Sequence, residues 1–209
     1  MTEKFPNILG LILAGGLGRR MEGRSKPLLE LGGRRLIDRI VAPAQAQCGA
    51  VALNLYDDDA APFAGLGLPI VADTAPGRLG PLAGVLGGMD FAATHCPDMD
   101  YVLSLPCDCP FLPDDLAARL LAAARDSRSG LVCAASGGRD HPVVALWPVT
   151  LRADLRRALL EERQHAVGAF QRDHDVKSVE WPAAARDPFF NINTPDDLDR
   201  AKTMLGDEE

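Results

Sequence analysis

The sequence predicts a three-layer α/β fold in which helices cover both faces of a mainly parallel sheet, and three observations support this class. Short apolar runs alternate along the chain with longer segments of helical periodicity. A glycine-rich turn follows the first apolar run directly, at residues 14–18. The chain has 209 residues, of which 47% are hydrophobic and 24% charged, so it is long enough to bury the core of one α/β domain.

The first half of the chain alternates regularly between expected strands and helices. The expected strands are short apolar runs bounded by turn residues, at 8–13, 51–55, 69–72 and 101–105. The expected helices are residues 35–47, 80–93 and 114–125. Pro81 suits the first position of the second helix. The helical spacing of the first is carried by Leu36, Ile37, Ile40 and Val41.

The rhythm changes beyond Gly130. Two strands joined by a turn are expected at 131–135 and 142–146, followed by a helix at 150–163 and short strands at 176–180 and 189–192. Thr194 and Pro195 are suited to cap and begin a last helix. We expect a single domain over residues 1–209, with residues 1–128 forming one half of a cleft and residues 129–209 the other half.

Composition excludes several classes of protein. A net charge of −7 argues against a nucleic-acid-binding surface, and no apolar stretch is long enough to cross a bilayer. Residues 1–7 lack the pattern of a signal peptide, so a cytoplasmic protein is expected. The five cysteines include no C-x-x-C pair and are expected to be reduced. Cys107 and Cys109 are interpreted as small residues at a strand end, since zinc spacing is absent.

Residues 11–33 carry the clearest chemical signal. Glycines in this stretch allow backbone N–H groups to approach an anion, because no Cβ atom blocks the approach. Arg19, Arg20, Arg24 and Lys26 follow and can neutralise phosphate charge. The stretch therefore predicts a phosphate-binding loop inside an otherwise acidic chain, although a strand, turn and helix with solvated arginines would have a similar composition.

Three phosphate-loop patterns compete for this stretch. The dinucleotide fingerprint G-x-G-x-x-G fits Gly16 and Gly18 but meets Met21 at its third glycine. The P-loop pattern nearly fits residues 18–25 but has Arg24 where it needs lysine. The pattern L-A-G-G-x-x-x-R-M followed by a lysine fits throughout, at Leu13, Ala14, Gly15, Gly16, Arg20, Met21 and Lys26.

On these residues the sequence resembles the nucleotidyltransferases with a Rossmann-like sheet, and most closely the molybdenum cofactor guanylyltransferases. Further motifs follow in the family's order, at Asp73 and residues 80–84, 105–110, 138–142 and 191–195. The resemblance implies the three-layer fold of the nucleotide-diphospho-sugar transferases. One position departs from the family, because Ser25 stands before Lys26 where an aspartate is usual.

Polar residues at strand ends are the first candidates for function, since ligands of open α/β sheets bind beyond the carboxyl ends of the strands. Asn54, Asp73 and Asp108 are expected there. Asp108 follows a central apolar strand, where a carboxylate needs a positive partner, and Mg²⁺ completed by phosphate and water is a natural one. The alternatives are a structural carboxylate paired with arginine at Asp108 and local turn roles for Asn54 and Asp73.

The resemblance also implies roles for single residues. GTP would be bound by Leu13, Ala14, Gly15, Gly16, Lys26, Asn54, Asp73 and Asp108, with Asp108 also holding Mg²⁺. His141 and Asn193 would lie on the side that receives a pterin. The alternatives are a strand-end histidine and an asparagine preceding a helix cap.

The implied reaction is transfer of GMP from GTP to the terminal phosphate of molybdenum-molybdopterin, with release of pyrophosphate. Asp108, Lys26, Arg20 and Arg19 are the expected catalytic residues, because positioning and charge neutralisation suffice when the attacking phosphate is already anionic. A cytidylyltransferase acting on the same pterin and a non-catalytic GTP-binding module are the alternatives; Gly15-Gly16 favours guanine. Candidate protein partners are those that deliver the pterin and those that act as chaperones of molybdoenzymes.

Overall fold

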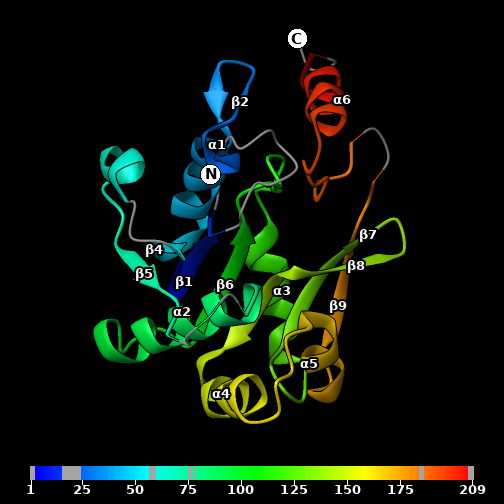
Figure 1. The fold of residues 1–209 in the computed structure, drawn as a ribbon. Coiled ribbons are helices and arrows are strands. Elements are labelled where there is room, and N and C mark those ends of the chain that lie inside the picture. Colours follow the sequence, from blue (N-terminus) through cyan, green and yellow to red (C-terminus); the bar gives the residue numbers. More distant parts are fainter. Residues whose placement is uncertain are drawn as a thin grey trace.

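A computed structural model of the protein describes residues 3–15, 25–56, 60–74, 77, 79–183 and 186–206. Seven strands form one sheet: β1 Phe5–Leu13, β4 Cys48–Leu55, β5 Ile70–Ala72, β6 Tyr101–Pro106, β7 Val132–Ser136, β8 Arg139–Pro148 and β9 Lys177–Trp181. Their order is β5-β4-β1-β6-β8-β7-β9 (Figure 1). Only β8 runs antiparallel to its neighbours, and the remaining pairs are parallel. The predicted mainly parallel sheet is confirmed.

Helices cover both faces of this sheet, as predicted. On one face lie α1 (Leu36–Gln47) and α3 (Leu116–Arg125). On the other lie α2 (Pro81–His95), α4 (Arg152–Leu160) and α5 (Val167–Asp173). The last helix, α6 (Pro195–Gly206), packs beside a small hairpin of β2 (Glu30–Leu31) and β3 (Arg34–Arg35) beyond the edge of the sheet (Figure 1). Short 3-10 helices occur at Lys26–Leu28, Ala61–Leu66 and Val149–Leu151.

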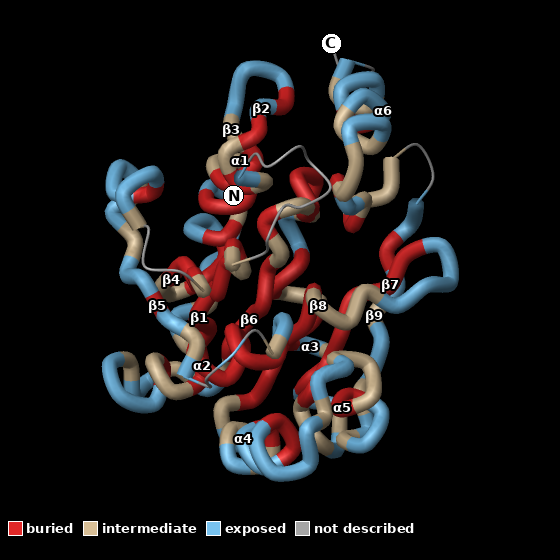
Figure 2. Tube along the Cα trace, viewed as in Figure 1, coloured by how far each residue is buried: buried red, intermediate tan, exposed pale blue. Residues whose placement is uncertain are grey.

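The sequence of β1 explains why helices cover both faces of the sheet. Successive side chains of a strand point to opposite faces, so a strand buried on both sides is apolar throughout. Ile8 and Ile12 pack into the cluster that contains α1 and α3, whereas Leu9 and Leu11 pack into the cluster of α2, α4 and α5. All four are fully buried, and Figure 2 shows this buried layer running through the middle of the molecule.

The predicted strand at residues 189–192 is wrong. These residues form a turn and an irregular segment, because their backbone donors bind elsewhere than in a strand ladder. The Phe189 N–H donates to Asp187 Oδ1 (2.9 Å), and the Ile192 N–H donates to the carbonyl of Asp108 (2.9 Å). The other expected elements are found within a few residues of their predicted bounds, while α5 and the β2–β3 hairpin were not predicted.

In the part of the chain that the structure describes, no helix combines the length and the apolar character needed to cross a membrane.

Candidate active site

The carboxyl ends of β4, β1 and β6 lie side by side and form the floor of the candidate site. Leu13, the last residue of β1, is paired with Asn54 of β4 on one side and with Pro106 of β6 on the other. The Ala14 N–H donates to the carbonyl of Asn54 (3.0 Å), and the Leu13 carbonyl accepts from Cys107 (3.2 Å). Adjacent strands are about 4.8 Å apart, so the ends of β4 and β6 are separated by roughly 10 Å, a distance that a nucleotide can span.

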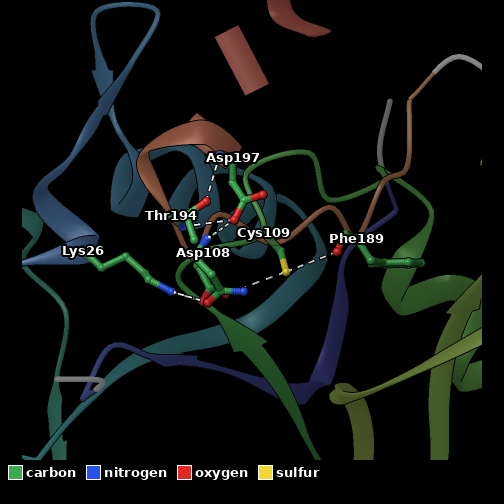
Figure 3. A network of polar contacts seen from close by, with 7 residues as sticks. Lys26, Asp108, Cys109, Phe189, Thr194 and Asp197 are labelled. Atoms are coloured by element: carbon green, nitrogen blue, oxygen red, sulfur yellow. Dashed lines mark hydrogen bonds and ion pairs between the residues drawn. The ribbon is translucent and has the colours of Figure 1, made fainter. Parts of the chain in front are cut away.

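Lys26, Asp108 and Asn193 meet above the end of β6. The Lys26 ammonium donates to Asp108 Oδ2 (2.8 Å) and to Asn193 Oδ1 (2.8 Å). The side chains of Lys26 and Asp108 are each only 15% exposed, so the ion pair is largely shielded from water. Figure 3 shows the side chains of Lys26 and Asp108 pointing toward one another. A desolvated, hydrogen-bonded pair of this kind has a defined geometry, unlike an exposed surface pair.

Two local structures hold these side chains in place. Lys26 begins a helical turn in which Pro27 is buried and the Leu28 N–H donates to the Ser25 carbonyl (3.0 Å). Ser25 therefore contributes to this turn through its backbone. At the other end, Asp197 Oδ2 accepts the N–H groups of Asn193 and Thr194 (both 3.0 Å), and the Asp197 N–H donates to Thr194 Oγ1 (3.2 Å; Figure 3). The predicted cap at Thr194 is thus present.

Asn54 and Asp73 form a second group at the ends of β4 and β5. The buried Asn54 amide donates to the Val71 carbonyl (3.1 Å) and to Asp73 Oδ1 (2.9 Å). Burial raises the pKa of Asp73, and the hydrogen bond from Asn54 opposes this effect. Helix α2 approaches this pair closely because residue 84 is glycine: a Cβ atom there would lie 2.4 Å from Asn54 Oδ1.

His141 belongs to a third group, on β7 and β8. Its Nε2 atom lies 2.7 Å from Ser136 Oγ, which also donates to Asp187 Oδ1 (2.7 Å). The His141 ring packs against Phe189 with a centroid distance of 5.0 Å. The Phe189 carbonyl accepts from Cys109, the residue after Asp108 (3.7 Å; Figure 3). Phe189 therefore lies between His141 and the residues around Asp108.

The glycine-rich turn is described only at its start. A Cβ atom on Gly15 would lie 2.9 Å from the Tyr56 nitrogen, so the absence of a side chain permits a close approach of two backbone segments. Gly16, Arg19 and Arg20 lie outside the described residues.

Asp108 offers a position for a hard cation. Asp108 Oδ2 is occupied by Lys26, whereas Oδ1 has only a weak contact from the Cys109 thiol (3.9 Å). Magnesium is commonly held by one or two carboxylates together with substrate phosphates and water, so a single available carboxylate oxygen fits this pattern. Burial raises the pKa of the Cys107 and Cys109 thiols, which keeps them protonated and unsuited to bind metal. No group of three metal-binding side chains occurs among the residues described.

Residues 10–176 match the model of the MobA-like NTP transferase domain. A molybdenum cofactor guanylyltransferase of Rhodopseudomonas palustris (strain BisB5) is 49% identical over 199 residues, which cover 95% of this chain and 94% of the relative. The enzyme of the same name from Bradyrhizobium sp. (strain ORS 278) is 47% identical over 200 residues, covering 96% and 94%. The chain belongs to the molybdenum cofactor guanylyltransferase family. It is therefore a nucleotidyltransferase enzyme.

Solved structures show the same fold. Molybdopterin-guanine dinucleotide biosynthesis protein A from Archaeoglobus fulgidus has a TM-score of 0.73 at 22% identity, covering 95% of this chain and 99% of that one. Rv0371C from Mycobacterium tuberculosis, solved in complex with manganese, has a TM-score of 0.66 at 16% identity and covers 94% and 98%. At these identities the likeness concerns the fold alone, and it confirms the Rossmann-like architecture predicted for a member of this family.

In this member of the guanylyltransferase family, Lys26, Asn54, Asp73 and Asp108 lie at the carboxyl ends of the strands as the sequence predicted, in two hydrogen-bonded groups. Asn193, which the sequence placed on the side of the acceptor, joins the first group through Lys26. Ser136 and Asp187, which hold His141, were not predicted. The only signal for them was Asp187 followed by Pro188, a pair typical of a turn.

Proposed function

We propose that this enzyme transfers GMP from GTP to the terminal phosphate of molybdenum-molybdopterin, releasing pyrophosphate and forming a molybdopterin-guanine dinucleotide. The observation that carries the proposal is the Lys26–Asp108 pair, held at 2.8 Å beyond the end of β6 and next to the glycine-bearing end of β1. A cation and a carboxylate at this edge suit a triphosphate with its metal. The name of the relatives at 47–49% identity supports guanine as the base and the pterin as acceptor.

The nucleoside would bind at the Asn54–Asp73 end of the site. The Asn54 amide fixes one oxygen of the Asp73 carboxylate, which leaves the other able to accept hydrogen bonds from a ligand. The backbone of Leu13, Ala14, Gly15 and Gly16 would approach the nucleotide directly, since successive backbone N–H groups can bind an anion. The end of β4 lies roughly 10 Å from the end of β6, so a nucleoside bound at Asn54 would extend its phosphates toward Asp108.

The triphosphate would bind the Lys26 ammonium. This ammonium is held by Asp108 and Asn193 beyond the end of β6. A phosphate oxygen can accept the remaining N–H of the ammonium, since an ammonium has three donors and two are in use. Arg19 and Arg20 belong to the same proposal as further cations for the departing pyrophosphate.

Asp108 would hold Mg²⁺ through Oδ1, with phosphate oxygens and water as the remaining ligands. When bound, the ion neutralises charge at the attacked phosphate. Asp108 itself then serves two cations, since its Oδ2 atom remains available to Lys26.

The chemical step needs no covalent enzyme intermediate. An oxygen of the pterin phosphate forms a bond to the α-phosphorus of GTP while the bond from that phosphorus to the bridging oxygen of pyrophosphate breaks. The attacking oxygen is already anionic at neutral pH, so no side chain has to remove a proton. Catalysis by this chain is then alignment of the two phosphates and compensation of their charge by Lys26 and its neighbours.

The acceptor would bind on the side of Asn193 and His141, contributed by residues 129–206. Asn193 reaches Lys26 from this side, so it links the two halves of the proposed cleft. Protein partners that deliver the pterin or receive the product, and a cytoplasmic location, are part of the same proposal. All five cysteines are free, four of them buried, as suits a reducing compartment.

Calorimetric titration with GTP, CTP and ATP, each with and without Mg²⁺, tests this function. We expect selective GTP binding that Mg²⁺ strengthens and that Lys26→Ala weakens at least tenfold, because one charge-assisted contact is lost. Lys202→Ala is the matched control, since Lys202 also pairs with an aspartate but on the exposed surface of α6. A preference for CTP, or equal binding by the Lys26→Ala variant, would contradict the assignment.

A further inference from the structure

The hydrogen bonds around His141 determine which of its ring nitrogens carries a proton. We infer that Ser136 and Asp187 hold His141 in the Nε2–H tautomer, so that its Nδ1 atom accepts a hydrogen bond from an N–H group of the acceptor's heterocycle. Ser136 and Asp187 are then positioning residues, and His141 determines specificity for the ring system of the acceptor. This inference rests on the proposed function, in which that acceptor is a pterin.

The direction of each hydrogen bond follows from what the atoms can donate. The Asp187 carboxylate can only accept, and its Oδ1 atom accepts from the Phe189 N–H (2.9 Å) and from Ser136 Oγ (2.7 Å). The single hydroxyl proton of Ser136 is thereby committed to Asp187. The remaining contact of Ser136 Oγ, at 2.7 Å from His141 Nε2, must be made by a proton on the histidine.

The second ring nitrogen is left open. Among the described residues, His141 makes no hydrogen bond other than the one through Nε2. In the same part of the chain, no side-chain nitrogen or oxygen is both buried and without a partner. Nδ1 is therefore accessible to a ligand, while the rest of the ring is half-buried against Phe189.

The burial of His141 favours its neutral form. Burial is the largest influence and lowers the pKa of His141; Asp187, Asp140 and Glu180 oppose it, and Arg139 adds to it. In the neutral Nε2–H tautomer, Nδ1 carries a lone pair and no proton. An acceptor atom repels the oxygens of a phosphate but complements the ring and amino N–H groups of a pterin.

The segment from Asp187 to Asn193 connects this histidine to the reaction site. At the start of this segment, Asp187 accepts a hydrogen bond from Ser136, and at its end Asn193 accepts one from Lys26. Between them, the Phe189 carbonyl accepts from Cys109 and the Ile192 N–H donates to Asp108. An acceptor whose ring contacts His141 would therefore extend its phosphate along this segment toward Asp108.

Nitrogen NMR of histidine-labelled protein tests the tautomer directly. The chain has four histidines, and the His141→Asn variant identifies the His141 signals by their loss. We expect an Nε2–H correlation and an unprotonated Nδ1 in the free protein near neutral pH. Ser136→Ala should release the ring into a mixture of tautomers, whereas Ser178→Ala, on the neighbouring strand β9, should leave it unchanged. An Nδ1–H tautomer in the unaltered protein would overturn the inference.

Titration with molybdopterin and steady-state kinetics provide the second readout. Molybdopterin should shift the Nδ1 resonance, and His141→Ala should raise KM for molybdopterin by about tenfold while kcat and KM for GTP stay within twofold. Ser136→Ala should raise it several-fold. His141→Asn should have a KM for molybdopterin close to that of the unaltered protein, unlike His141→Ala, because the amide oxygen of asparagine can take the place of Nδ1.

The outcomes separate this inference from the proposed function. An Nδ1 resonance that molybdopterin leaves unchanged, or a Ser136→Ala variant with normal KM for molybdopterin, would overturn the inference even if GMP transfer is observed. A molybdopterin-dependent Nδ1 shift in a protein that transfers no GMP would instead reject the proposed function and leave the role of His141 in place.

Discussion

The Lys26–Asp108 pair should contribute measurably to stability, and a double-mutant cycle can isolate that contribution. The perturbations are Lys26→Met and Asp108→Asn, which remove each charge and keep most of the volume. Their charged atoms are 2.8 Å apart, and at an effective dielectric constant of about 20 two unit charges at that distance attract by roughly 6 kcal/mol. Desolvation offsets much of this attraction, because each side chain is only 15% exposed.

The expected net effects follow from what each variant leaves behind. Either single substitution strands one charge in a shielded position and should lower the free energy of unfolding by about 2–4 kcal/mol. Lys26→Met also removes the donor to Asn193. The double variant should cost little more than either single one, which corresponds to a coupling energy of about 1–3 kcal/mol.

Urea denaturation in EDTA measures these free energies without metal. The exposed pair Lys202–Asp199, whose side chains are 54% and 72% exposed, provides the matched cycle and should give a coupling of about 0.2–0.5 kcal/mol. Adding Mg²⁺ should restore more stability to Lys26→Met than to the unaltered protein, since the ion can compensate Asp108. A coupling energy for Lys26–Asp108 no larger than that of the control pair would refute the reasoning.

Three further predictions concern the other two groups of the site. Burial raises the pKa of Asp73, so the folded protein binds a proton at this carboxylate more readily than the unfolded chain does. The free energy of unfolding should therefore fall as pH rises from the ordinary pKa of aspartate through the raised pKa of Asp73. Asp73→Asn should remove this dependence and raise Tm, while weakening GTP binding in calorimetry. Gly84→Ala should push Asn54 aside and cost about 1–3 kcal/mol in thermal unfolding, whereas Gly206→Ala, with open space around it, should be neutral or stabilising. Because burial lowers the pKa of His141, KM for molybdopterin should rise as pH falls below the ordinary range of histidine, and a KM independent of pH there would contradict an acceptor role for Nδ1.

The nucleotide half of the fold was predictable because local signals and global topology agree there. The run at β1 is apolar on both faces, so it predicts a central strand covered by helices on each side. Once the strands are known to be parallel, Asn54, Asp73 and Asp108 must share one edge of the sheet. The sequence therefore anticipated where these residues lie, although not which atoms they bind.

Contacts between distant segments could not be predicted. Lys26 contacts Asp108, 82 positions away in the sequence, and Asn193, 167 positions away, and no local pattern specifies either contact. The wrong prediction of a strand at residues 189–192 has the same origin. The backbone N–H groups of this apolar segment donate to Asp187 and Asp108 and not to a neighbouring strand. Helix α5 was missed because its seven residues are too few for a clear period, and its buried Gln171 depends on the Pro142 carbonyl (2.8 Å).

The most direct test of the central claim is the product formed from GTP and molybdenum-molybdopterin in the presence of Mg²⁺. We expect one pyrophosphate released for each guanylylated pterin, little product from CTP, and no turnover by Asp108→Ala. Near-normal turnover by Asp108→Ala in Mg²⁺, or faster product formation from CTP than from GTP, would contradict it.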